Sequence, residues 1–121
     1  MYFRLVCNNK LSDYESLVRS IVGQQISTFA ARSIFERLLQ TVSGVITPET
    51  ITSLTVASLR DIGLSRQKIS YIQDMGKNLI EGSINLGDLY SMSDEKAIST
   101  LIGLRGVGEW TAQMFVMSQL G

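Results

Sequence analysis

Two glycines one residue apart lie beside the only tryptophan of the chain, within GLRGVGEWTA at residues 103–112. Glycine adopts positive φ without strain, so the chain can reverse its direction tightly at this point. Because Gly106 and Gly108 lack side chains, a ligand can also approach their amides closely. A helix that starts directly after them adds unsatisfied N–H groups and a partial positive charge. The spacing predicts an anion site made of backbone amides, and a plain turn between two helices is the alternative.

The charge balance argues against a protein that coats nucleic acid through bulk charge. The chain has 121 residues, with 11 Lys+Arg and 11 Asp+Glu, and 45% of its residues are hydrophobic. This composition supports a real core and argues against disorder. A neutral chain can still bind a phosphate through backbone amides, so a local site on nucleic acid stays open.

The cysteine and histidine counts exclude several chemistries. The chain has one cysteine, Cys7, and no histidine. An internal disulfide, a Cys/His zinc site, a four-cysteine iron–sulfur cluster and histidine acid–base catalysis are therefore excluded. A nucleophilic cysteine needs a basic partner, and none is in view for Cys7, so we expect a reduced, half-buried thiol. We expect no cofactor, and the sequence leaves open whether a monovalent cation binds at the turn that contains Gly106 and Gly108.

The apolar pattern is helical nearly everywhere, and no segment alternates convincingly with period two. Hydroxyl residues that can cap helix starts stand at Ser12, Ser27, Thr47, Thr55, Ser65 and Ser93. The expected helices begin at these caps, with one turn at 86–90 and a last helix over about 109–120. Residues 1–121 therefore predict a single, compact, all-α domain. With no signal peptide and no membrane-spanning apolar run in view, we expect the cytoplasm, near the nucleoid, or the nucleus as its location. We also expect a monomer, which the sequence alone does not establish.

Three co-linear blocks resemble the helix-hairpin-helix DNA glycosylase superfamily, and most closely the branch of 3-methyladenine DNA glycosylase II. The blocks are LRGVGEWTA at 104–112, IVGQQIS at 21–27 and GLSRQK at 63–68. The similarity extends from about Tyr14 to Gly121. It implies a helix-hairpin-helix fold, double-stranded DNA containing a damaged base as partner, and base excision as activity. Such enzymes flip the damaged base out of the duplex, and water then cleaves its bond to the sugar.

The resemblance also implies roles for individual residues around the hairpin. Trp110 matches a pocket-lining aromatic position, and Met114 lies one turn later on the same face. An electron-rich wall suits a cationic alkylated purine, although core packing is the alternative for both side chains. Where strand-nicking members carry a lysine that attacks the sugar, this chain has Trp110, which cannot form a Schiff base. A monofunctional glycosylase is therefore expected.

Other positions are expected to contact the DNA strand. The expected phosphate-binding residues are Arg105, Gly106, Val107, Gly108 and Thr111. Gln25 matches the position that fills the gap left by the flipped base, and Gln24 either assists it or supports the turn; the alternative is that both amides cap helix ends. Arg66 and Lys68 are candidates for further backbone contacts, with solvated surface as the alternative. The carboxylate of Glu109 should turn away from a bound phosphate.

The family's catalytic aspartate is expected beyond Gly121, so no catalytic residue is assigned within this chain. Asp94, Glu95 and Glu109 are better explained as acids at helix starts. We therefore expect the contiguous DNA-binding half of a glycosylase, inactive by itself. A non-catalytic helix-hairpin-helix module and a helical protein-interaction domain are the competing interpretations.

Overall fold

The computed structural model describes residues 12–120, which are helical and include no strand. Cys7 lies outside the described residues. The elements are α1 (Asp13–Gly23), α2 (Thr28–Thr41), α3 (Pro48–Thr52), α4 (Val56–Ile62), α5 (Arg66–Glu81), η2 (Leu86–Ser91), α6 (Asp94–Ile102), α7 (Glu109–Phe115) and η3 (Val116–Leu120). The all-α prediction is confirmed.

The helix starts follow the predicted hydroxyl caps. In each case a serine or threonine oxygen accepts a hydrogen bond from the amide three residues later: Ser12, Ser27, Thr47, Thr55, Ser65 and Ser93. Such a cap satisfies one of the amides that a helix start leaves without a partner, which stabilises the helix by about 1 kcal/mol. Local side-chain chemistry thus sets where most of the helices begin.

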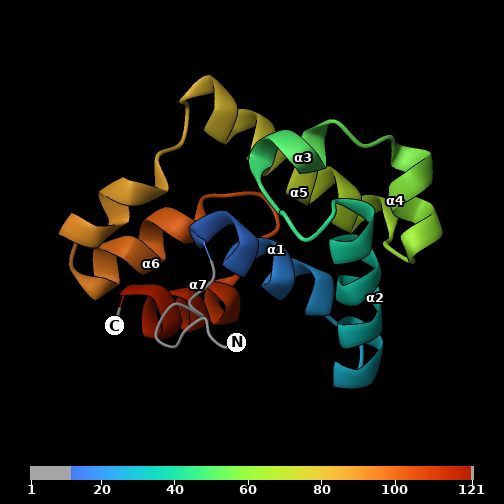
Figure 1. Ribbon diagram of the computed structural model, residues 1–121. Helices are drawn as coiled ribbons and strands as arrows, with labels where there is room; N and C mark the ends of the chain where they lie inside the picture. Colours follow the sequence, from blue (N-terminus) through green and yellow to red (C-terminus); the bar gives the residue numbers. More distant parts are fainter. Residues whose placement is uncertain (1–11, 121) are drawn as a thin grey trace.

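Helix α1 is the central element of the fold. It packs against α2, α5 and α7, and in Figure 1 the helices α2 to α5 gather on one side of it while α6 and α7 lie on the other. One face of α1 is completely buried and supplies Tyr14, Leu17, Val18, Ile21 and Val22 to the core. This spacing is the amphipathic stripe expected of a helix that faces a core. Because α1 ends at Gly23, its last turn leads directly into the short connection to α2.

The pair α3 and α5 packs closely over the first turn of α1. The Tyr14 hydroxyl donates a hydrogen bond of 2.7 Å to the Ile72 carbonyl of α5. A Cβ atom at Gly76 would lie only 2.9 Å from that hydroxyl and 3.4 Å from the Cα of Pro48. A glycine at this position therefore allows the three helices to approach one another.

The chain after the hairpin departs from the single predicted helix over 109–120. The α-helix ends at Phe115, and η3 continues it as a π-helix. Within η3, Gln119 is buried, and its side-chain amide donates to Asp13 Oδ1 at 3.0 Å. The Tyr90 hydroxyl donates to the same oxygen at 2.7 Å. The widened turn thus coincides with a polar contact that joins η3 and η2 to the start of α1.

Residues 12–120 contain neither a membrane-spanning helix nor a metal-binding cluster of side chains. No helix in this range combines the length and the apolar character that crossing a membrane requires. Nor does this part of the chain gather three or more His, Cys, Asp or Glu side chains in a group that could hold a metal ion.

Candidate nucleic-acid interface

Three segments that are distant in sequence meet at one hollow of about 440 Å³. They are the connection between α1 and α2, the first turns of α5, and the hairpin between α6 and α7. The lining residues are Gln24, Gln25, Gln67, Lys68, Tyr71, Gly106, Val107 and Gly108. The structure therefore brings together residues from all three blocks that carry the sequence resemblance.

The two hairpin glycines occupy different backbone conformations and different surroundings. Gly106 has φ 85°, and a Cβ atom there would lie 2.5 Å from the ring of Tyr71. Its position therefore requires both positive φ and close approach to α5. Gly108 is extended, with φ −90° and ψ −177°, and a Cβ atom there would meet nothing within 4 Å. The expectation that both glycines serve the tight reversal therefore holds for Gly106 alone, and Gly108 leaves open space above the backbone.

The amides of the hairpin decide whether an anion can be held there. Among residues 12–120, no hydrogen-bond partner is found for the amides of Gly106 and Gly108, and Gly108 starts α7 without a side-chain cap. The amide of Val107 instead donates to the Leu104 carbonyl at 3.2 Å, and its side chain is buried. Val107 therefore does not fit the predicted phosphate contact, whereas the two glycine amides are available for one.

The side chain of Gln24 binds the hairpin from the connection between α1 and α2 and does not project toward a DNA strand. Its Nε2 donates to the Gly106 carbonyl at 2.8 Å and to Thr111 Oγ1 at 3.3 Å. Thr111 is 2% exposed, so its hydroxyl faces this internal contact and not a ligand. The geometry favours the supporting role expected for Gln24, and it disfavours the predicted phosphate contact from the Thr111 side chain.

Lys68 also makes internal contacts. Its ammonium donates to the Val22 carbonyl at 2.8 Å and to the Gln24 carbonyl at 2.6 Å. Both acceptors lie at the end of α1, where carbonyls lack helical partners and the helix carries partial negative charge. Partial burial lowers the pKa of this ammonium group. Lys68 is therefore not a solvated surface residue, and its ammonium group is already engaged within the protein instead of being free for a DNA phosphate. The structure corrects both interpretations of Lys68 that the sequence suggested.

Gln25 is exposed and has φ 61°, in the left-handed region. For a residue with a Cβ atom, this conformation costs about 1–2 kcal/mol. Backbone strain of this kind persists only where the surroundings determine it, and it often marks functional sites. The strained position is the one from which a side chain is expected to enter the DNA stack.

The two arginines assigned to strand contacts differ in their surroundings. Arg105 forms an ion pair with Asp74, and its guanidinium carbon lies 5.4 Å from the centre of the Tyr71 ring. A phosphate contact from Arg105 would have to compete with that pair. Arg66 is exposed at the start of α5, and no hydrogen bond or ion pair is found for its side chain within residues 12–120. Arg66 therefore remains available for a strand contact.

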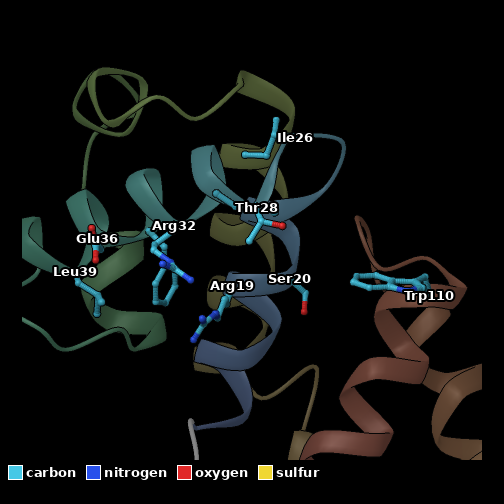
Figure 2. Close-up of a pocket in the computed structure, with 11 residues that line it drawn as sticks. Arg19, Ser20, Ile26, Thr28, Arg32, Glu36, Leu39 and Trp110 are labelled. Atoms are coloured by element: carbon cyan, nitrogen blue, oxygen red, sulfur yellow. The ribbon is translucent and has the colours of Figure 1, made fainter.

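Trp110 stands at the edge of a second hollow. The indole is 65% exposed, which removes core packing as its role in this chain. The hollow measures about 560 Å³ and lies between α1 and α2, with Trp110 facing it from α7 (Figure 2). Met114 is 39% exposed but does not line this hollow. The structure therefore places Trp110, but not Met114, at this cavity.

The opposite wall of that hollow was missed in the sequence. Arg19 of α1 lies over the buried ring of Phe35 of α2, with 5.4 Å between its guanidinium carbon and the ring centre. Ser20 lies between Arg19 and Trp110 in Figure 2. Arg19 and Ser20 lie outside the buried face of α1, whereas Phe35 belongs to the buried face of α2. The arginines and serine that an amphipathic helix leaves outside its stripe are the signal that could have found them.

The Glu109 carboxylate lies near the hairpin but is directed along the helix. Its Oε2 accepts a hydrogen bond of 3.3 Å from the side-chain amide of Gln113, one turn later. This orientation agrees with the expectation that the carboxylate turns away from an anion at the hairpin.

Comparison with known proteins defines the class. The family model for HhH-GPD superfamily base excision DNA repair proteins matches residues 18–118. Because this match covers most of the chain, the protein belongs to the HhH-GPD superfamily, and the predicted resemblance is confirmed.

Individual relatives agree with this assignment. A solved DNA-3-methyladenine glycosidase from Bacillus halodurans is 36% identical with a TM-score of 0.85, over 93% of this chain and 52% of that one. A Schizosaccharomyces pombe 3-methyladenine DNA glycosylase, solved with abasic DNA, is 30% identical with a TM-score of 0.80, over 90% and 54%. A Bacillus subtilis protein, named as a candidate DNA-3-methyladenine glycosylase, is 34% identical over 91% of this chain and 41% of its own length. The chain thus spans about half the length of these relatives.

Proposed function

We propose that this chain is the DNA-binding part of a monofunctional DNA N-glycosylase that removes alkylated purines such as 3-methyladenine, and that it acts as a monomer. The observation that carries the proposal is that the exposed Trp110 indole stands two residues after Gly108, close in sequence to two glycine amides that are open to a ligand. Membership of a base excision repair superfamily supports the reaction class. The names of the relatives support the substrate class.

The proposed division of labour follows from the chemistry of each group. The amides of Gly106 and Gly108 hold one phosphate of the strand, which needs no side-chain charge. Gln25 enters the space left by the extruded nucleotide and can hydrogen-bond the unpaired base opposite. Trp110 offers an electron-rich face to the flipped base, and cation–π attraction favours a purine that alkylation has made positive.

The reaction itself also needs a group that stabilises the positive sugar as the base departs. A carboxylate is suited to this task, as at other glycosidic centres. Glu109 is engaged with Gln113, and Asp94 and Glu95 lie in the first turn of α6. We propose that none of these serves the reaction and that the 121-residue chain alone does not release methylated purines. Release of 3-methyladenine by the purified chain would contradict this part of the proposal.

DNA binding is the first experiment. A duplex with a stable abasic-site analogue and the same duplex without it are titrated into the chain at low salt. We expect preference for the abasic duplex and a shallow dependence of affinity on salt, because few side-chain cations contact the strand. Absence of binding to both duplexes would favour a helical protein-interaction domain instead.

A trapping experiment separates the monofunctional from the strand-nicking chemistry. Borohydride reduces the Schiff base that an amine nucleophile forms with an abasic sugar. With Trp110 at the position of that nucleophile, we expect no covalent adduct between the chain and abasic DNA. An adduct would show that a lysine elsewhere in the chain attacks the sugar.

A further inference from the structure

The connection between α1 and α2 is fixed by contacts from two other parts of the fold. Lys68 of α5 binds the carbonyls of Val22 and Gln24 from one side, at 2.8 and 2.6 Å. From the other side, the Gln24 side chain binds the Gly106 carbonyl of the hairpin at 2.8 Å. Gln24 is therefore held by its main chain to α5 and by its side chain to the hairpin.

The residue that follows this doubly held position is the strained one. Gln25 has φ 61° although it carries a Cβ atom. A free turn would relax toward negative φ, because the left-handed conformation is unfavourable for such a residue. Fixing the carbonyl of Gln24 restricts the peptide plane that joins it to Gln25. The contacts of Lys68 thus act directly on the backbone that sets the direction of the Gln25 side chain.

We propose that Lys68 is a positioning residue that, through Gln24, keeps Gln25 in its projecting conformation and in register with the hairpin amides. The inference rests on the proposed function, in which Gln25 enters the DNA stack and the hairpin holds a phosphate. Lys68 uses two of its three N–H donors on the turn, and it lines the same hollow as Gly106 and Gly108. One side chain therefore joins the wall of the phosphate site to the inserting residue.

Burial and charge fit a positioning role. Lys68 is half-buried, and burial lowers the pKa of its ammonium group. The ammonium group therefore loses part of its hydration at this position, and the two carbonyl contacts replace it. An uncharged residue of similar length would fill the same space but leave the carbonyls of Val22 and Gln24 without these donors. Arg66 provides a matched control, because it is an exposed cation on the same helix with no partner found within residues 12–120.

The first test needs no DNA. Backbone ¹⁵N relaxation reports the order parameter of the Gln25 amide in the wild type, Lys68→Met and Arg66→Met. We expect a value of about 0.85 in the wild type and in Arg66→Met, and below about 0.6 in Lys68→Met. If Lys68→Met leaves the order of Gln25 unchanged, the proposal is overturned. Lys68→Leu, which also lacks a donor, serves in its place if Lys68→Met does not fold by circular dichroism.

The second test measures preference for the abasic-analogue duplex over the intact duplex. A positioning role predicts that Lys68→Met lowers this ratio at least about fivefold, a coupling of about 1 kcal/mol. It should match the loss in Gln25→Ala, and the double variant should lose no more than either single variant. Lys68→Arg, whose guanidinium can donate to both carbonyls, should keep the ratio near the wild type.

Other outcomes separate this inference from the proposed function. Equal loss of affinity for both duplexes in Lys68→Met would make Lys68 a simple phosphate contact and would overturn the positioning role. Arg66→Met is expected to show that equal loss. If the wild type binds neither duplex, the proposed function fails, whereas the order parameter of Gln25 still decides whether Lys68 positions the turn.

Discussion

The two ends of α1 differ in what their side chains contact. At its first turn, Tyr14 is buried and bonded to the Ile72 carbonyl, and Asp13 accepts hydrogen bonds from Tyr90 and Gln119. At its last turn, the chain passes into Gln25, which is exposed and has unfavourable φ. Polar groups at the first end are bonded within the protein, whereas the second end is held in place so that it can present one side chain outward.

The contrast between the two ends predicts that residues important for stability and residues important for DNA recognition lie at different ends of α1. Changes at the first end should lower the free energy of unfolding and leave the preference for damaged DNA unchanged. Changes at the second end and in the adjoining hairpin should mostly do the reverse.

The largest expected effect comes from the hairpin glycines, where the separation should fail at one residue and hold at the other. Gly106→Ala should lower the free energy of unfolding by about 3 kcal/mol, because its Cβ atom would overlap Tyr71 in a left-handed conformation. Gly108→Ala should lower it by only about 0.5–1 kcal/mol, the cost of alanine at a helix N-cap, because a Cβ atom there meets nothing. Urea unfolding measures both.

DNA titration completes this comparison. Both alanine variants should bind the abasic-analogue duplex more weakly, since a methyl group at Gly108 occupies the space through which a phosphate approaches. Equal stability of the two variants would contradict the different roles assigned to the glycines.

Trp110→Ala should weaken binding to DNA that carries a flipped alkylated base by about 1–3 kcal/mol, the usual contribution of base–aromatic stacking. The same change should leave the unfolding midpoint nearly unaltered, because the indole is 65% exposed. Met117→Ala is the control, since that side chain is 71% exposed on η3. Because Trp110 is the only tryptophan, its intrinsic fluorescence measures the contact directly. If the fluorescence does not change when DNA with the damaged base binds, Trp110 does not line the base pocket.

Tyr14→Phe should lower the free energy of unfolding by about 1 kcal/mol, because it removes a buried hydrogen bond. The preference of the chain for abasic over intact DNA should stay as it is. Gln25→Ala is the matched change at the other end of α1 and should show the opposite pattern. A loss of DNA preference in Tyr14→Phe would mean that the two ends are coupled through the helix.

The smallest expected effect is a pH dependence at the first end. Burial, and then the hydrogen bond to Asp13, raise the pKa of Tyr90 to about 12. A raised pKa in the folded state stabilises the protein below the unfolded value of about 10, and this contribution is lost as pH rises from there through 12. Tyr90→Phe should therefore reduce the loss of stability between pH 9 and pH 12. A remaining loss is expected from Tyr14, whose pKa burial also raises. Identical pH profiles for the wild type and Tyr90→Phe would exclude this contribution.

Sequence reasoning predicted those features that depend on neighbours along the chain. The caps at Ser27, Thr47 and Ser65 act on amides three residues away, so the helix starts followed from local pattern. The contact between Lys68 and the Gln24 carbonyl joins residues 44 positions apart, and no local pattern encodes it. The same holds for the ion pair of Arg105, which depends on how α5 approaches the hairpin.

Within the hairpin, the sequence predicted the availability of the amides but not how the glycines differ. Gly-x-Gly is compatible with positive φ at either position, and only the packing of Tyr71 against Gly106 explains which glycine turns the chain. The partner of Gln24 could not be predicted for the same reason, because the Gly106 carbonyl lies 82 positions further along the chain.

The hairpin amides are tested most directly by nuclear magnetic resonance. Duplex DNA carrying an abasic-site analogue is titrated into ¹⁵N-labelled chain while the amide signals of Gly106 and Gly108 are followed. We expect these two signals to shift early and to saturate together, while the amide of Val107, already bonded to Leu104, shifts less. Binding that leaves both glycine signals in place and shifts residues elsewhere would contradict a phosphate held by the hairpin backbone.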